Sequence, residues 1–139
     1  MSEQIKSNKQ FDLEGRLIEF AVIIIQISES LFKSPAGNHI SGQIVRSGTS
    51  PALHYGEAQS AESRNDFIHK LKVLLKELRE TNVALKIVKR VPLTSKMDTV
   101  EQAIGECNEL IAIFVKSIDT AKRNNEESKR KSHLEAVKS

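Results

Sequence analysis

Residues 12–32 read DLEGRLIEFAVIIIQISESLF, and this stretch decides the fold. Its apolar residues recur at intervals of three and four, which indicates one face of an α-helix that contains Leu13, Leu17, Phe20, Ile24, Ile27 and Leu31. Four further apolar residues, Ile18, Val22, Ile23 and Ile25, lie outside that face. A surface helix of a monomer needs a single apolar face. We therefore expect this helix to be central in the fold or to contact another subunit.

Three more segments have helical periodicity. Pro35 suits the first turn of a second helix, because its missing N–H would have no partner there. We expect that helix to be kinked near Gly48 and Pro51, since both residues disfavour a regular helix interior. Ser63 caps the predicted third helix, whose apolar stripe contains Phe67, Leu71, Leu74, Leu78, Leu85 and Val88. The stripe of the fourth helix contains Val100, Ala103, Cys107, Leu110, Phe114 and Ile118.

The connections near residues 33–36, 62–64 and 91–95 are short, and short connections make consecutive helices antiparallel neighbours. The predicted fold is all-α, an antiparallel up-and-down four-helix bundle over residues 11–121. The 6 glycines, 3 prolines and 4% aromatic residues are too few for the many turns of a β-sandwich or barrel. We expect residues 1–10 to be a disordered N-terminal arm. We expect the charged residues 122–139 to be disordered or a frayed extension of the fourth helix.

The sequence also indicates where in the cell the protein is located. Residues 1–10 contain no apolar core of the kind found in signal peptides. The most apolar stretch, residues 20–27, is far shorter than the roughly 20 residues that span a bilayer. We therefore expect a cytoplasmic protein that does not insert into a membrane. Its single cysteine excludes an intrachain disulfide framework and a metal site built from several cysteines.

Three blocks of the sequence carry a family resemblance. The first contains residues 12–14 with Arg16, Phe20 and Ala21, and the second contains Gln43 with residues 46–50 and 55–58. The third contains Ser63, residues 66–68, Lys70, residues 75–77 and residues 80–81. In this order, the blocks resemble the four-helix-bundle (S23-like) family of proteins encoded in intervening sequences of bacterial 23S rRNA genes. The resemblance covers roughly residues 12–90.

The resemblance implies a bacterial cytoplasmic four-helix bundle that assembles into a ring-like homopentamer. The same assembly is associated with a related protein, the accessory variability protein of diversity-generating retroelements, which binds nucleic acid. The sequence differs from common members at residues 51–54, where PALH replaces a frequent Ile-Gly-Ala-Asn-like stretch.

One polar segment in the predicted second helix has the composition of a site: Arg46, Ser47, Gly48, Thr49 and Ser50. Arginine can make bidentate hydrogen bonds to carboxylate or phosphate. The segment matches neither the phosphate loop GxxxxGK[ST] nor the nucleophile elbow GxSxG. We therefore favour a structural role, in which the hydroxyls bond to backbone groups at a kink and Arg46 pairs with an acid such as Glu57.

Other candidate groups also favour structural readings. Tyr55 and Glu57 could supply an acid and a base, but the sequence offers them no nucleophile or metal partner, so we assign them a structural or interface role. Asp66 and His69 share a helix face, but two ligands leave a zinc site incomplete. Cys107 continues the apolar stripe of the fourth helix, which is typical of a core residue. We predict no metal, no cofactor and no catalytic residue.

Basic residues give the clearest functional hint. Residues 66–90 contain seven basic residues and three acids, and five of the basic residues fall near one helical face: Lys72, Lys76, Arg79, Lys86 and Arg90. Residues 122–139 add six basic residues against three acids. A stripe of this kind can follow the phosphates of a nucleic acid, although a solvated helix face has the same composition.

These observations lead to competing functional hypotheses. The first is a non-enzymatic homo-oligomer, a pentamer by the family resemblance, that binds the RNA or DNA backbone through the basic surface. The alternative is a pure protein-interaction and assembly module without nucleic-acid binding, which the extra apolar residues of the first helix favour. The third hypothesis is an enzyme, for which the sequence offers only Arg46, Tyr55 and Glu57 as candidate active-site residues.

Overall fold

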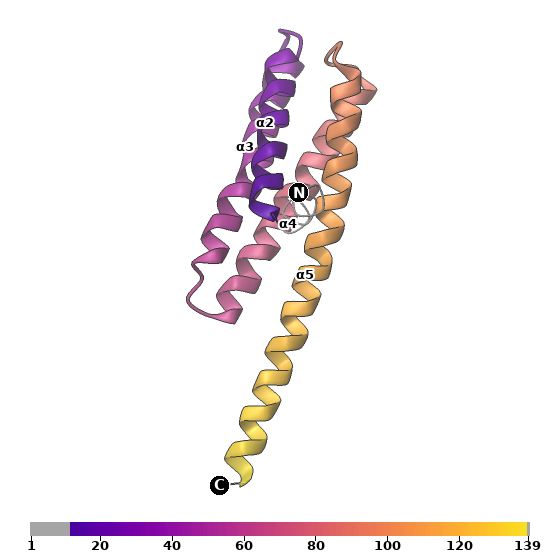
Figure 1. Ribbon diagram of the computed structural model, residues 1–139. Helices are drawn as coiled ribbons and strands as arrows, with labels where there is room; N and C mark the ends of the chain where they lie inside the picture. Colours follow the sequence, from indigo (N-terminus) through magenta and orange to yellow (C-terminus); the bar gives the residue numbers. More distant parts are fainter. Residues whose placement is uncertain (1–11, 139) are drawn as a thin grey trace, which may run out of the picture.

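The computed structural model describes residues 12–138 of the 139-residue chain, and these residues form four α-helices joined by short loops (Figure 1). The helices are α2 (Leu13–Ser30), α3 (Pro35–Gln59), α4 (Arg64–Arg90) and α5 (Met97–Lys138). The described residues contain no β-strand. In Figure 1 the chain reverses direction at each loop. The predicted all-α, four-helix fold is confirmed.

Three of the helices begin at a residue whose side chain caps the first turn. Asp12 accepts a hydrogen bond from the Gly15 N–H at 2.8 Å, and Ser34 and Ser63 each accept one at 3.0 Å from the N–H three residues later. Such caps satisfy backbone donors that have no partner inside the helix. Pro35 occupies the first turn of α3. The predicted cap at Ser63 and the predicted place of Pro35 are both confirmed.

The core lies between the four helices. Each helix packs against the next along the chain, and α5 closes the bundle against α2, whereas α2 does not pack against α4. Because both sides of every helix have a neighbour, aliphatic side chains fill the interior. The largest fully buried side chains are Leu17, Phe20, Ile24, Ile27, Ile44, Leu71, Leu74, Leu78, Leu85, Val88, Leu110 and Phe114. No helix in the described part of the chain combines the length and the apolarity needed to cross a membrane.

α3 continues as one helix through Pro51, without a break. Pro51 cannot donate a backbone hydrogen bond to the carbonyl four residues earlier. Just before it, the hydroxyls of Thr49 and Ser50 donate to the carbonyls of Val45 and Arg46, each at 2.6 Å. Hydroxyls therefore satisfy backbone acceptors around the proline, as the sequence suggested. A kink at this point stays a prediction.

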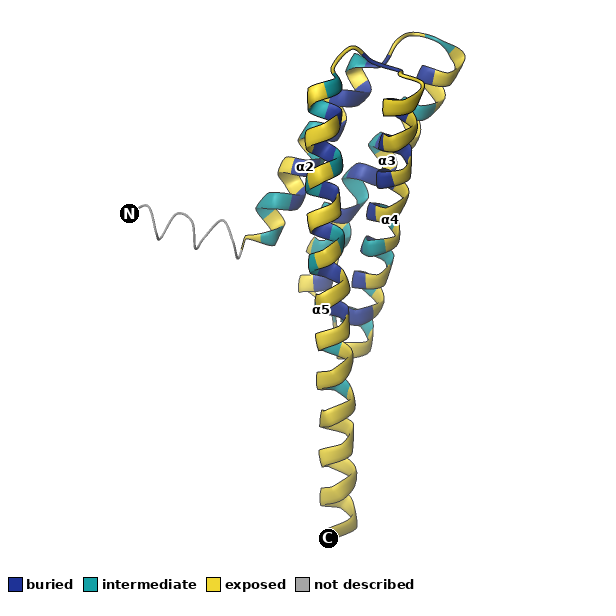
Figure 2. Ribbon diagram, turned by 90° about the vertical axis from the view of Figure 1, so that its right-hand side faces the viewer, coloured by how far each residue is buried: buried dark blue, intermediate teal, exposed yellow. Residues whose placement is uncertain are grey.

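For the C-terminal part of α5 the sequence predicts either disorder or a frayed extension of the fourth helix, and the structure has the helical extension. α5 stays helical through Lys138 and extends far beyond the other helices, where its residues are exposed (Figures 1 and 2). Residues 122–138 contain no glycine or proline and are rich in Lys, Arg and Glu, which are good helix formers. Propensity can thus continue a helix that the bundle has already nucleated. The predicted N-terminal arm, residues 1–10, lies outside the described residues.

Candidate functional site

The five basic residues predicted on the third helix all lie on the solvent side of α4: Lys72, Lys76, Arg79, Lys86 and Arg90. The opposite side of α4 supplies core residues. Within residues 12–138 none of the five side chains forms an ion pair, whereas their neighbour Lys89 pairs with Glu101 of α5 at 2.6 Å. We call these five residues the basic face. It is a surface of exposed cations that form no direct ion pair with the described part of the chain.

The acids that could neutralise the basic face are engaged elsewhere. Arg46 of α3 donates to Glu77 at 3.1 Å and to Glu80 at 2.5 Å, and both carboxylates belong to α4. The hydrogen bond from Arg46 lowers the pKa of Glu80, and the same bond raises the pKa of Arg46. Lys76 stands four residues before Glu80 but is not within ion-pair distance of it. Arg46 therefore occupies the two glutamates of α4 that lie nearest to the basic face, and the five residues of that face form no ion pair within residues 12–138.

The predicted pairing of Arg46 with Glu57 is wrong. The two residues are eleven positions apart on one continuous helix, which corresponds to about 16 Å along its axis. Glu57 instead accepts a hydrogen bond from Lys70 of α4 at 2.9 Å, with His54 Nδ1 at 3.8 Å. That bond from Lys70 lowers the pKa of Glu57. Arg46 and Glu57 thus each pair with residues of α4, but at different positions along the α3–α4 contact.

The remaining residues of the polar segment face the bundle. Ser47 is buried, and the Thr81 hydroxyl lies 2.8 Å both from Ser47 Oγ and from the carbonyl oxygen of Glu77. Gly48 lies against α2, since a Cβ at this position would come within 2.6 Å of Ile24 Cγ2. Ser47 and Gly48 thus lie at the contacts of α3 with α4 and with α2, whereas Thr49 and Ser50 bond to carbonyls of α3 itself.

Tyr55 and Glu57 do not form an acid–base pair. Tyr55 turns inward, where its ring meets Phe114 of α5 edge to face, with centroids 5.9 Å apart and planes at 71°. Burial, followed by the charge of Glu14, raises the pKa of Tyr55. Glu57 is exposed on the α4 side, because residues two apart on a helix point in different directions. The contact of Tyr55 is one of core packing.

Cys107 is a core residue, as predicted. It is fully buried, its thiol donates to the carbonyl oxygen of Leu78 at 3.2 Å, and burial raises its pKa to about 11. A thiol with so high a pKa holds little thiolate at neutral pH. Over residues 12–138, no three His, Cys, Asp or Glu side chains gather as a metal site would require.

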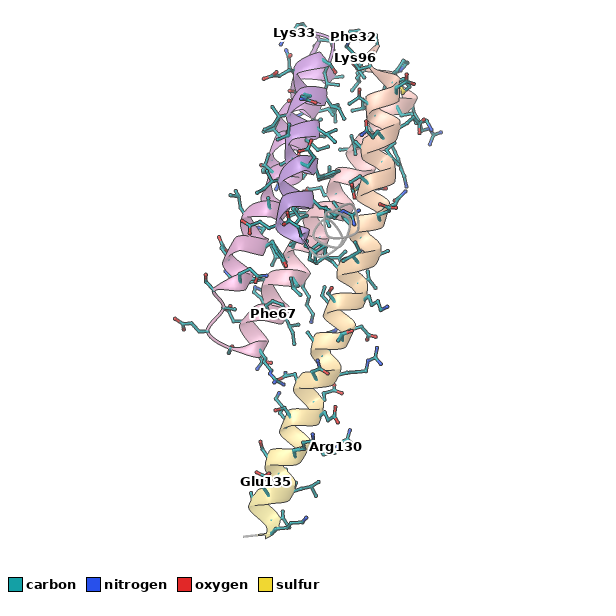
Figure 3. All side chains as sticks on the ribbon, in the orientation of Figure 1. Phe32, Lys33, Phe67, Lys96, Arg130 and Glu135 are labelled. Atoms are coloured by element: carbon teal, nitrogen blue, oxygen red, sulfur yellow. The ribbon has the colours of Figure 1, made fainter. Side chains whose placement is uncertain are left out.

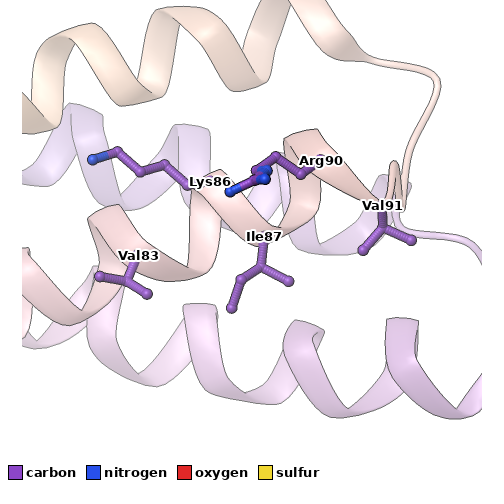
Figure 4. Close-up of a pocket in the computed structure, with 5 residues that line it drawn as sticks. All are labelled: Val83, Lys86, Ile87, Arg90 and Val91. Atoms are coloured by element: carbon purple, nitrogen blue, oxygen red, sulfur yellow. The ribbon is translucent and has the colours of Figure 1, made fainter.

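An apolar row beside the basic face was missed from the sequence. Val83, Ile87 and Val91 follow one another along the outside of α4, and with Lys86 and Arg90 they line a shallow pocket of about 470 Å³ (Figure 4). Val83 is 59% exposed and Ile87 is 43% exposed. The sequence does contain a pattern that indicates this row, since the three apolar residues repeat at intervals of four outside the core stripe. The outer surface of α4 is therefore both cationic and apolar.

Three of the four extra apolar residues of the first helix lie on the outer surface of the bundle, whereas Ile23 is partly buried against the core. Ile18, Val22 and Ile25 are 49%, 40% and 39% exposed. Of the two places expected for them, the bundle centre is excluded, and a subunit contact stays a prediction. A contact between subunits would remove this aliphatic surface from water.

The extension of α5 carries the second cluster of basic residues. Its base is fixed to the start of α4, where Arg64 donates to the Asn124 carbonyl at 3.1 Å and Asn125 to Asn65 at 2.9 Å. Beyond Asn125 the side chains point into solvent, as Figure 3 shows for Arg130 and Glu135. The basic residues of the extension are Lys122, Arg123, Lys129, Arg130, Lys131 and Lys138.

Comparison with known proteins places the chain in a family. Residues 9–116 match the family described as 23S rRNA-intervening sequence protein. A crystal structure of a protein with unknown function from the S23 ribosomal protein family of Bacteroides thetaiotaomicron is 32% identical, with a TM-score of 0.69 over 76% of this chain and 96% of that chain. No curated protein matches. Since the match covers most of the chain, from α2 through the first half of α5, the chain belongs to the 23S rRNA-intervening sequence protein family.

Proposed function

We propose that this chain is a non-enzymatic, self-assembling four-helix bundle that binds the phosphate backbone of RNA or DNA through the basic face. The observation that carries the proposal is a row of five exposed cations without ion-pair partners, next to acids that Arg46 already occupies. The family description refers to 23S rRNA, which makes RNA the first polyanion to test. Following the family resemblance, we propose a ring-like homopentamer in the cytoplasm as the assembled form.

The binding mechanism is phosphate neutralisation. The basic face extends from Lys72 to Arg90, about 27 Å along the helix axis, which is long enough to follow several phosphates of one strand. None of its five residues is aromatic, so it offers no platform on which bases could stack. With five contacts to single-stranded RNA, the logarithm of affinity should fall by about 3.5 per tenfold rise in salt. Affinity should therefore drop about 100-fold between 50 and 200 mM salt.

Fluorescence anisotropy with a labelled single-stranded RNA and a labelled DNA duplex tests this proposal. The variant Lys72→Glu/Lys86→Glu should lose at least tenfold in affinity at about 50 mM salt, because two cations of the row become anions. The matched control is Lys33→Glu/Lys96→Glu, which makes the same change in net charge at the end of the bundle opposite the α5 extension (Figure 3).

The control variant should bind within threefold of the unmodified protein. Absence of binding at about 50 mM salt, where backbone contacts are still strong, would remove the nucleic-acid proposal. Equal loss in both variants would show that net charge, and not the basic face, governs binding.

A pure assembly module is the second candidate function, and the exposed aliphatic residues Ile18, Val22 and Ile25 favour it. Multi-angle light scattering on protein freed of nucleic acid checks assembly directly. A monomer at every micromolar concentration would contradict assembly in both candidate functions. An oligomer that binds no RNA or DNA would favour the second candidate over the first.

The proposal includes no catalytic step and no cofactor. The groups that could have acted as acid and base, Tyr55 and Glu57, point to different sides of α3, and Arg46 is committed to two carboxylates. Such an arrangement lacks the convergent polar groups of an active site. Binding and assembly are therefore the activities that the described surfaces support.

A further inference from the structure

The outer surface of α2 carries a row of residues with acids at both ends and an apolar centre. The row is Glu14, Ile18, Val22, Ile25 and Glu29, at spacings of four, four, three and four, and all five side chains are exposed. Neither glutamate forms an ion pair within residues 12–138. The two glutamates are fifteen residues apart, which is about 22 Å along a helix. We call this set the acidic row.

The outer surface of α4 carries a row of the opposite sign. It consists of Lys76, Val83, Ile87 and Arg90, at spacings of seven, four and three, and all four side chains are exposed. Glu80 lies on the same side of α4 between Lys76 and Val83, where Arg46 pairs with its charge. The basic ends are fourteen residues apart, about 21 Å along the helix, and the apolar pair lies between them. We call this set the basic row. It has the length of the acidic row, an apolar centre like that of the acidic row, and opposite charge at each end.

We infer that the acidic row on α2 of one copy packs against the basic row on α4 of a second copy; this inference rests on the self-assembly in the proposed function. The apolar centres would cover one another, and each glutamate would meet a cation. A contact between two acidic rows, or between two basic rows, would place like charges at both ends.

The pairing also fixes the type of assembly. α2 and α4 lie diagonally across the bundle and do not pack against each other, and the residues of both rows are exposed, so the two rows of one chain lie on different sides of the bundle. A copy therefore uses its acidic row with one neighbour and its basic row with another. Such a head-to-tail contact closes into a ring when the rotation permits, and otherwise grows as a filament.

The remaining cations of the basic face stay free. Lys72, Arg79 and Lys86 are seven residues apart, so they form a neighbouring line along α4. Assembly occupies Lys76 and Arg90 and leaves this line for phosphates. If the pairing holds, each copy of the assembled protein makes three phosphate contacts instead of five, and the logarithm of affinity falls by about 2.1 per tenfold rise in salt. Around a closed ring the line would repeat once per copy, which would give a polyanion several parallel tracks of positive charge.

Charge-swap variants measured by sedimentation velocity test the pairing. Glu14→Lys/Glu29→Lys and Lys76→Glu/Arg90→Glu should each shift the oligomer to monomer at about 150 mM salt, because like charges then face each other. A chain with all four substitutions should assemble again. The matched control, Lys72→Glu/Lys86→Glu, changes the same number of charges on the same helix and should keep the oligomer while it loses RNA binding.

The inference is overturned if either two-residue swap leaves the oligomer intact, or if the four-residue swap stays monomeric while its circular dichroism is native. Should a charge variant not fold, Ile18→Ser/Ile25→Ser takes its place, and an unchanged oligomer in that variant also overturns the pairing. A monomeric unmodified protein would end the assembly proposal itself. An intact oligomer in both swaps, with RNA binding retained by the unmodified protein, would end only the pairing.

Discussion

Arg46 Nη2 of α3 lies 2.5 Å from Glu80 Oε2 of α4, and this contact decides the charge of the α4 surface. Glu80 follows Lys76 by one helical turn and would be its natural partner on an isolated helix. The bond from Arg46 lowers the pKa of Glu80 and keeps its negative charge on the α3 side. An interaction between two helices thus sets which cations of α4 are left for a partner.

Replacement of Arg46 should weaken RNA binding although Arg46 lies outside the basic face. In Arg46→Ala, Glu77 and Glu80 lose their guanidinium partner, and their charges act on Lys76 and its neighbours. We expect RNA affinity to fall three- to tenfold at about 50 mM salt, measured by anisotropy, with the difference shrinking at higher salt. Adding Glu77→Gln/Glu80→Gln to this variant should restore most of the affinity. If the added substitutions restore nothing, Arg46 contributes through its own charge instead.

Gly48 should tolerate no side chain. A Cβ there would lie 2.6 Å from Ile24 Cγ2 and 3.0 Å from Ile24 Cβ, and Ile24 is fully buried. Gly48→Ala should therefore destabilise the fold by about 1–3 kcal/mol, as overpacked cores do. Gly56→Ala, on the same helix with open space around it, should instead stabilise it by up to about 1 kcal/mol.

Urea denaturation of both glycine variants gives this comparison. Ile24→Ala combined with Gly48→Ala should cost less than the sum of the single changes, because the smaller residue accepts the new methyl group. Equal midpoints for Gly48→Ala and the unmodified protein would show that α2 and α3 are not in close contact at this point.

Stability should fall at alkaline pH because of Cys107. Burial raises its pKa from 9.0 to about 11, so the unfolded chain releases the thiol proton at lower pH than the folded chain. The stabilisation is complete below pH 9 and is lost as the pH rises from 9 to 11. At about 1.4 kcal/mol per pKa unit, the loss is about 2–3 kcal/mol. Urea unfolding at pH 8 and pH 10.5 measures it.

Cys107→Ala is the control for the alkaline effect. This variant should be less stable at pH 8, because it loses the thiol contact to the Leu78 carbonyl and some packing, but it should lose less stability between pH 8 and pH 10.5. Tyr55, whose pKa is also raised, contributes equally to the pH dependence of stability in both proteins. An identical pH dependence of both proteins would contradict this role of Cys107.

The end of α5 should be helical but weakly protected. Residues 126–138 are exposed along their whole length, so their helix is not stabilised by core packing. We expect hydrogen–deuterium exchange to label these amides within seconds, while the amides near Leu110 and Phe114 exchange many orders of magnitude more slowly. A chain that ends at Asn125 should keep its thermal midpoint within about 2 °C. Strong protection of residues 126–138 in the oligomer would instead show that a neighbouring copy covers them.

The number and order of the helices could be read from the sequence. Apolar residues at intervals of three and four defined the core faces, and Pro35, Ser63 and Pro92 marked ends and beginnings. Core positions such as Leu17, Leu74 and Phe114 followed from the same periodicity. The basic face was also predictable, because exposure on a helix follows from spacing once the core face is known.

The sequence alone therefore determined the helices, their buried faces and the line of cations on α4, since each depends on residues a few turns apart. Only the tertiary structure decided which charges meet between helices. Arg46 could have been matched to Glu57 by composition, but the distance along α3 forbids that contact, and the packing of α3 on α4 selects Glu77 and Glu80. In the same way, the extra apolar residues of α2 could lie in the core or outside it, and the closure of the bundle by α5 placed three of the four outside. Periodicity fixes the faces of a helix, whereas partners across a helix contact depend on axial height and rotation, which no local pattern encodes.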